Sequence, residues 1–275
     1  MCCPKCSASL KSDAEHLVCA GCGSCYQASG PVSFLNLDAP ALIPEKSDSF
    51  LSNLKKIFKQ YPKVYGLFYY LLGALFVGQN AKKSLAGLSK GALIVNLGSG
   101  PKRIRPDVIN VDLLPLPNVD IIADIAHLPF GNATVDAVIS ELVLEHVSDP
   151  QAVLTEMERV LKPGGLIYLV APFVENFHSS PGDYFRWTKP GLKIFFQNFE
   201  EKKTGIRCGP ASAFAAVSQE FFALLLSFGW RPLQQFWSLV FMIILSPVKL
   251  LDIILSKFPG AENISLAFYY IGIKK

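Results

Sequence analysis

Charged residues are scarce in this chain. Asp, Glu, Lys and Arg make up 17% of its 275 residues, and the net charge is only +4. A charge this small permits contact with anionic lipid or with nucleic acid but favours neither. Hydrophobic residues make up 51% of the chain. We therefore expect a large core and, in addition, an apolar surface for a membrane or a partner.

Cysteine is almost absent after residue 25. Six of the seven cysteines fall within residues 2–25, and Cys208 is the other one. This distribution argues against a disulfide framework and favours a metal site. No secretory leader is visible, since the first residues are polar and rich in cysteine. We expect a reducing, cytoplasmic setting.

The cysteine-rich segment, residues 1–37, has the spacing of a zinc ribbon. Two Cys-x2-Cys pairs lie twelve residues apart and can bind one tetrahedral Zn²⁺ through the thiolates of Cys3, Cys6, Cys19 and Cys22. Cys2 and Cys25 are spare thiols that could replace one of these ligands. Four thiolates leave no open coordination position, so the predicted zinc is structural. Free thiols in a flexible tail are the alternative.

An apolar helical segment is expected over residues 51–90, after a linker over 38–50 that is rich in Pro, Ser and Asp. Between Lys63 and Lys82 it holds 18 uncharged residues, which is the lower edge of membrane-spanning length. A single crossing would place the ribbon outside the cytoplasm, where its thiolates would oxidise. We expect instead a helix over residues 64–78 that lies in the membrane interface or is docked on protein, with an amphipathic core helix as the alternative.

The region 91–275 has the pattern of a doubly wound α/β domain. Short β-branched runs such as "ALIVNL", "DVINVD" and "GLIYLVAP" alternate with helical stretches, which predicts a Rossmann-like, mostly parallel sheet. We expect seven strands. The last strand, "ISLAFYYIGIKK", is expected to be antiparallel and to follow an apolar helical insert over residues 209–258.

The residues at three predicted strand ends indicate a nucleoside site. Gly98 and Gly100 follow the first strand, and Asp112 and Asp124 end the next two. Ligands of such sheets bind beyond the carboxyl ends of the strands. Two acids at successive strand ends suit an adenosine better than a dinucleotide, which would require a third glycine where Arg103 stands. No Gly-Lys-Ser/Thr follows the turn, which disfavours a nucleotide triphosphate.

Four motifs resemble those of class I S-adenosylmethionine-dependent methyltransferases, most of all the ubiquinone and menaquinone biosynthesis branch. They are "VNLGSGP", "VINVD", "ADIAHLPFGNATVDAVISELVLEHVSDP" and "EMERVLKPGGLIYLVAPF". The N-terminal segment resembles the zinc ribbon that precedes many bacterial methyltransferases. The resemblance implies that S-adenosylmethionine is the co-substrate and that the residues contacting it are Asn96, Gly98, Ser99, Gly100, Asp112, Leu113, Asp124, Ile125 and Glu141.

Two positions depart from the family pattern. Asn96 stands where the family usually has an acid, and Lys102 stands where it often has glycine. The connection from Gly98 to the second strand is about nine residues, too short for a helical crossover. We expect the first helix to be a single turn or missing, and cofactor affinity to be reduced.

The stretch "NFHSSPGDYFRWTKPGL" after the fifth strand holds four polar candidates for catalysis: His178, Asp183, Tyr184 and Arg186. His178 is the expected general base, because its ordinary pKa of about 6.5 suits proton acceptance at neutral pH. The alternative is that Asp183 and Arg186 form a structural ion pair and that His178 caps a loop.

The apolar insert suggests the class of methyl acceptor. Residues 211–256 are expected either to insert as a hairpin into the cytoplasmic leaflet or to cover a hydrophobic pocket. Both favour a lipid, an isoprenoid or a lipid-linked small molecule as the methyl acceptor. The protein would then be peripheral on the inner face of the membrane. A ribosomal RNA methyltransferase with a zinc ribbon is disfavoured, because the basic residues are dispersed. A non-catalytic S-adenosylmethionine-binding or partner module is the other alternative.

Overall fold

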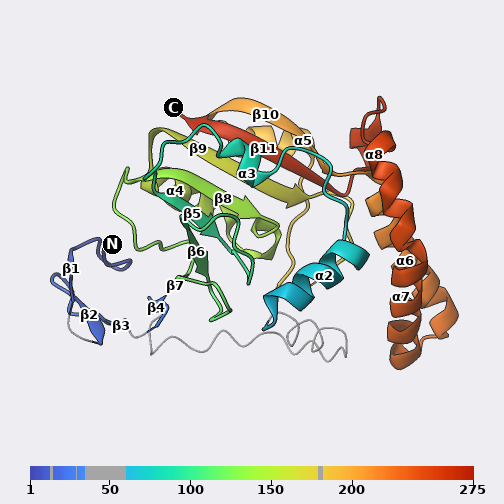
Figure 1. Cartoon of the computed structure of the whole chain (residues 1–275), viewed down its shortest axis with the longest axis horizontal. Helices are drawn as coiled ribbons and strands as arrows, with labels where there is room; N and C mark the ends of the chain where they lie inside the picture. Colours follow the sequence, from blue (N-terminus) through green and yellow to red (C-terminus); the bar gives the residue numbers. More distant parts are fainter. Residues whose placement is uncertain (13–14, 29, 35–59, 179–181) are drawn as a thin grey trace.

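The computed structural model describes residues 1–12, 15–28, 30–34, 60–178 and 182–275 (Figure 1). The expected linker over 38–50 lies outside these residues. The first nine residues of the expected helical segment over 51–90 lie outside them as well.

The described residues form one mixed sheet in the order β1-β2-β3-β4-β7-β6-β5-β8-β9-β11-β10. Seven of these strands, from β7 to β10, belong to the expected α/β domain. The expected count is too small for the whole sheet, because four strands of the cysteine-rich segment extend it. The strands are β1 (Leu10–Ser12), β2 (His16–Cys19), β3 (Cys25–Gln27), β4 (Val32–Ser33), β5 (Ile94–Leu97), β6 (Val108–Asp112), β7 (Ile121–Ile122), β8 (Val135–Glu141), β9 (Leu161–Pro172), β10 (Phe199–Cys208) and β11 (Ala267–Lys274).

The strands from β4 to β9 pair in parallel, and those at both ends of the sheet pair antiparallel. The seven strands of the α/β domain are mostly parallel, as expected, and β1–β3 add antiparallel pairs at the other end of the sheet. β11 lies between β9 and β10 and pairs antiparallel with both, which confirms the expected direction of the last strand. β4 joins the cysteine-rich segment to the domain through the pairs Val32–Ile121 and Ser33–Ile122.

The central strands form where the sequence is apolar on both faces, and helices cover them. All four residues of β5 are buried. Helix α4 (Pro150–Val160) begins where the Asp149 side chain accepts the Ala152 N–H and Pro150 takes the first helical position. It ends at Val160, just ahead of Lys162-Pro163-Gly164-Gly165. Its buried side chains join the core cluster that also holds the apolar residues of the cysteine-rich segment.

No helix is assigned between β5 and β6 over residues 98–107, which confirms the expectation drawn from the short connection. The remaining short elements of the domain are α3 (Ala81–Ser84), η1 (Leu144–His146), α5 (Lys189–Phe195) and η3 (Ala261–Ile264).

The apolar insert is a helical hairpin that lies beside the sheet, at the right of Figure 1. It consists of α6 (Pro210–Ser227), α7 (Arg231–Leu245), η2 (Ser246–Leu251) and α8 (Asp252–Leu255). Pro247 lies in the first turn of η2, where the α-helical geometry of α7 has ended, as its missing N–H predicts.

Helix α2 (Pro62–Leu72) corresponds to the helix expected over 64–78 but ends six residues earlier. The chain beyond it is extended and forms a bridge between Phe76 and Cys208, next to α6. Four of the apolar side chains of α2 are exposed: Val64, Leu67, Tyr70 and Leu71. These four side chains therefore do not contribute to the core.

Candidate functional site

The glycine turn after β5 has the backbone geometry that close approach of a ligand requires. Gly98 and Gly100 both have positive φ, +61° and +56°. A Cβ on Gly98 would lie 2.5 Å from Cγ2 of Val143, so no larger residue fits there. At Gly100 no atom lies within 4 Å of the position a Cβ would take, so this side of the turn is open. Ser99 donates its hydroxyl to the Gly100 carbonyl at 3.1 Å.

The two strand-end aspartates lie on neighbouring parallel strands. The Gly100 N–H donates to Asp112 Oδ2 at 2.8 Å, and the Leu114 N–H donates to Asp112 Oδ1 at 3.0 Å. Both carboxylate oxygens are thus oriented, and each keeps a lone pair for a further donor. Asp124 is exposed and accepts the Ala126 N–H at 2.9 Å. Leu113 is half-buried and Ile125 is buried behind the same loops.

Asn96 is part of a buried amide network below the turn. Its register partner on β6 is Asn110, and the Asn96 Nδ2 donates to the Asn110 Oδ1 at 3.1 Å. Asn110 in turn donates to the carbonyls of Lys102 and Asn118, at 3.2 and 2.8 Å. The side chain of Asn118 then donates to the Pro101 carbonyl at 3.0 Å. Asn96 therefore supports the turn through its amide nitrogen.

Asn110 was missed at the sequence level, although a fully buried amide in the middle of an apolar strand is itself a signal. Arg103 also stabilises this loop through hydrogen bonds. Its guanidinium donates to the Val108 carbonyl at 2.9 Å and to Asp120 Oδ1 at 2.7 Å. The residue that replaces the third glycine of a dinucleotide site is thus structural.

Lys102 and Glu141 form an ion pair across the expected cofactor site. The Lys102 Nζ lies 3.7 Å from Glu141 Oε2, and the side chains are 62% and 17% exposed. The ammonium group also lies 5.9 Å from the centre of the Phe76 ring, and the Arg207 guanidinium lies 4.2 Å from that same ring. Glu141 ends β8, so a lysine reaches it from the turn after β5.

The expected catalytic residues lie on the loop after β9, but two of them pair with each other. Arg186 donates to both carboxylate oxygens of Asp183, at 2.5 and 2.7 Å, and the Asp183 side chain is 1% exposed. Burial raises the pKa of Asp183, but hydrogen bonds from Arg186 and the His178 N–H outweigh it and hold that pKa below its ordinary value. The structure thus shows the ion pair that was the alternative to a catalytic role.

His178 and Tyr184 have different surroundings. The His178 Nδ1 lies 3.0 Å from the Asn176 carbonyl oxygen, and its ring meets that of His146 edge-on at 5.0 Å. The Tyr184 ring is exposed, while the Tyr184 N–H donates to the Glu145 carbonyl at 2.7 Å. His178 therefore lies beside η1, and the Tyr184 side chain faces outward.

Glu145 is a site residue that sequence reasoning missed. Its side chain is 0% exposed, and neither carboxylate oxygen has a hydrogen-bond partner. Burial, followed by the nearby carboxylate of Glu175, raises the pKa of Glu145 to about 8. The only sequence signal is an acid next to His146 in a short apolar turn.

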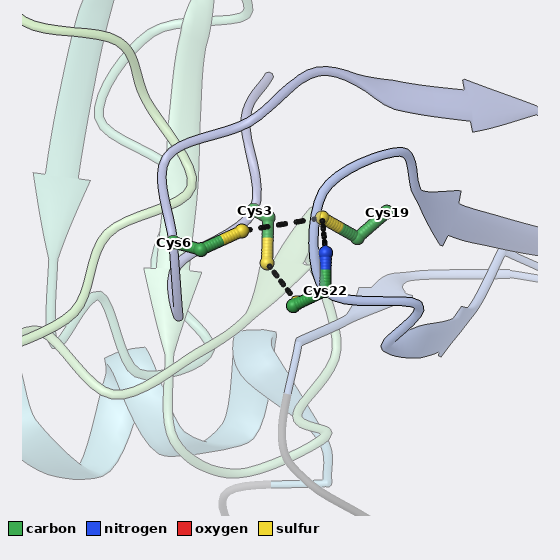
Figure 2. Close-up of side chains that lie close together, drawn as sticks. All are labelled: Cys3, Cys6, Cys19 and Cys22. Carbon is green, nitrogen blue, oxygen red and sulfur yellow. Dashed lines mark hydrogen bonds between the residues drawn. The ribbon is translucent and has the colours of Figure 1, made fainter.

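The four expected zinc ligands converge at the N-terminal end of the chain (Figure 2). The Sγ atoms of Cys3 and Cys22 are 3.6 Å apart, and those of Cys6 and Cys19 are 3.4 Å apart. Sulfurs bound to one tetrahedral zinc at about 2.3 Å lie about 3.8 Å from each other. Cys2 and Cys25, the spare thiols, are not part of this group.

The backbone around these sulfurs has the turn geometry of a Cys-x2-Cys metal-binding loop, in which N–H groups point at a sulfur. The N–H groups of Gly21 and Cys22 donate to Cys19 Sγ, and the Cys22 hydrogen bond lowers the pKa of Cys19. The Ser24 hydroxyl lowers the pKa of Cys22 to about 6. A Cβ on Gly21 would lie 2.8 Å from the Ala8 Cβ, so this turn requires glycine. The donor set and its spacing fit a zinc ion.

Comparison with known proteins places a methyltransferase domain at the sheet. Residues 104–169 match the family model described as "Methyltransferase domain". The demethylmenaquinone methyltransferase of Renibacterium salmoninarum is 41% identical over 91 residues, which are 32% of this chain and 33% of that protein. The arsenite methyltransferase of Halobacterium salinarum is 28% identical over 137 residues, 39% of this chain and 35% of that protein.

A solved structure of phosphoethanolamine N-methyltransferase 2 from Haemonchus contortus, in complex with S-adenosyl-L-methionine, is similar with a TM-score of 0.47. It is 14% identical and covers 79% of this chain and 56% of that one. The chain spans about a third of the length of the two curated relatives. Residues 104–169 are therefore similar to a methyltransferase domain.

Proposed function

We propose that this chain transfers the methyl group of S-adenosylmethionine to a small molecule. The observation that carries the proposal is the arrangement of Gly98, Gly100, Asp112 and Asp124 at the ends of adjacent parallel strands. The matched methyltransferase segment, 104–169, includes both aspartates. The sulfonium supplies the reactive methyl group, and the protein supplies positioning for an in-line displacement.

The residues present fit this co-substrate. Gly100 leaves the turn open to an approaching ligand. Asp112, held by two backbone N–H groups, offers its remaining lone pairs to both hydroxyls of a ribose. Asp124 can accept from the adenine amino group, and the Ile125 N–H can reach a ring nitrogen. Glu141 can accept from the methionine ammonium once Lys102 releases it.

Calorimetric titration with S-adenosylmethionine and S-adenosylhomocysteine tests the proposal. The full chain should bind both, and Asp112→Ala should weaken binding at least tenfold, because two hydrogen bonds to the ribose are lost. Asp107→Ala is the matched control. Asp107 lies at the other end of β6, is exposed and pairs with Arg105. Absence of binding by the unaltered chain would leave only a non-catalytic module.

The helical hairpin supports a lipid-like or membrane-linked acceptor. Two helices, Pro210–Ser227 and Arg231–Leu255, are long and apolar enough to cross a membrane by length and composition. Only 33% and 17% of their apolar windows are buried, so most of the apolar surface of both helices is exposed. Large side chains that point into solvent include Phe214, Phe221, Leu225, Phe228, Trp230 and Phe236. A patch of this extent is rare on a soluble monomer unless it binds something.

Two buried charged residues anchor this hairpin to the domain. Asp252 accepts the N–H groups of Gly209, Ala211 and Ser212 at the start of α6, at 2.7–3.2 Å. Lys249 donates to the carbonyls of Tyr70, Leu71 and Gly73 at the end of α2, at 2.5–3.1 Å. The exposed faces of α2 and of the hairpin are therefore held in a fixed relation, as one membrane-facing surface requires.

We propose peripheral contact with the cytoplasmic leaflet through this surface, in residues 64–78 and 211–256. Both ends of the hairpin lie on the domain, so it can only enter a bilayer from one side. The methyl acceptor would then be taken from the lipid phase. Zinc in the four-cysteine group would be structural and would stabilise the strands that extend the sheet.

A further inference from the structure

Three potential metal ligands outside the expected cofactor residues meet at the carboxyl ends of β8 and β9. Glu145 and His146 belong to η1, directly after β8, and His178 belongs to the loop after β9. Each offers one ligand atom, and these atoms all lie within 4.8 Å of one another. Segments 32 residues apart in the chain thus bring together two imidazoles and one carboxylate.

Both imidazoles are oriented as metal ligands are. The His146 Nδ1 lies 2.6 Å from the Gly182 carbonyl oxygen, and the His178 Nδ1 lies 3.0 Å from the Asn176 carbonyl oxygen. A carbonyl can only accept, so each Nδ1 carries a proton, and a ring with no second proton has its lone pair on Nε2. Metal-binding histidines typically donate the other ring N–H to a carbonyl in this way.

Glu145 is the acidic member of the group. Its carboxylate is fully buried, neither oxygen accepts a hydrogen bond, and Oε1 lies 4.0 Å from the His146 Nε2. An acid buried without a partner is destabilising, and a cation bound between the carboxylate and the imidazoles would compensate for it. The positive charge of Arg186 attracts this carboxyl group, but Arg186 donates no hydrogen bond to it, so both oxygens stay available to a cation.

We propose that Glu145, His146 and His178 bind a divalent transition metal, such as Zn²⁺ or Mn²⁺, at a site separate from the four cysteines. Two imidazoles and a carboxylate form a set that such ions accept with positions left open for water or an oxygen of a small molecule. Bonds of about 2.1 Å place ligand atoms about 3.0–3.4 Å apart, so the three side chains must move closer together when an ion binds. The role of His178 as a metal ligand excludes its role as a general base.

The site does not depend on S-adenosylmethionine binding, so its test is independent of the proposed function. Electron paramagnetic resonance of added Mn²⁺ reports the bound ion directly, because bound Mn²⁺ loses the signal of the free ion. The purified full chain keeps zinc on its cysteines, since thiolates prefer zinc to manganese. Zinc content after dialysis, measured by mass spectrometry, gives the stoichiometry of both sites.

The unaltered chain should bind about one Mn²⁺, or a second equivalent of zinc beyond the cysteine site. Glu145→Gln and His178→Ala should each weaken this binding at least tenfold. His16→Ala, which removes an exposed histidine of β2, should leave it unchanged. The His178 side chain is 33% exposed, so its loss tests the site even where Glu145→Gln folds poorly. No metal beyond the cysteine site, or equal binding by His178→Ala, would overturn the proposal.

Discussion

The ammonium of Lys102 lies 3.7 Å from the carboxylate of Glu141, so the turn after β5 is tied to the end of β8. In the proposed complex the same carboxylate faces the methionine ammonium. A residue of the protein therefore competes with the co-substrate for one acceptor. Since Lys102 is 62% exposed, the pair is weak and can open.

Lys102→Ala should strengthen S-adenosylmethionine binding by roughly three- to tenfold, because Glu141 is released and a positive charge leaves the site. Calorimetric titration measures the change. Lys82→Ala, which removes a lysine from α3, is the control and should leave the affinity as it is. Weaker binding by Lys102→Ala would show that the lysine contacts the ligand favourably.

Asp252→Ala should destabilise the protein by about 2–4 kcal/mol, because three N–H groups at the start of α6 lose their acceptor inside the protein. Urea unfolding followed by circular dichroism gives the free energy of unfolding. Glu262→Ala is the control, since Glu262 is a surface acid of η3 paired with Lys189. Equal effects of the two substitutions would mean that Asp252 does not anchor the hairpin.

Replacing Phe228 and Trp230 together by Asp should reduce binding to liposomes of anionic phospholipid. The two side chains are 90% and 63% exposed at the tip of the hairpin, and burying a charge there in lipid is costly. Flotation in a sucrose gradient measures the bound fraction. Ile194→Asp introduces a charge at an exposed apolar residue of α5, away from the hairpin, and should float like the unaltered chain. A chain that stays wholly soluble in all forms would contradict membrane contact.

Cys6→Ser should lower zinc content at the cysteine site and the melting temperature together, because a four-thiolate ion stabilises only the folded ribbon. Cys25→Ser should change neither, since Cys25 is exposed and outside the cluster. Titration of the stripped protein with Co²⁺ follows the site by its thiolate absorption. The same cobalt spectrum from both variants would exclude the proposed ligand set.

The sequence predicts the central strands well because their apolar character is local. β5, β8 and β9 are buried on both faces, and their β-branched runs indicate strands without knowledge of their neighbours. The joining of β4 to β7 depends on two residue pairs about ninety positions apart in the chain. No local sequence pattern predicts that pairing, so only seven strands were expected in the sheet.

The candidate site was predicted in outline for a similar reason. Glycines and acids at strand ends are local signals, and they identify Asp112 and Asp124. The pairing of Asn96 with Asn110 and the meeting of Glu145 with His178 arise only when separate strands lie side by side. Likewise, the contact between Asp183 and Arg186 depends on the rotamers of both side chains. A spacing of three residues permits this contact but does not require it.

Because β4 lies along β7, the edge of the domain next to the proposed adenine contact is occupied by the cysteine-rich segment. Ser33 pairs with Ile122, two residues before Asp124. Oxidants or chelators that strip the thiolates would loosen this strand and, with it, the loop that carries Asp124. Nucleoside affinity would then respond to the redox state of cysteines that never touch the ligand.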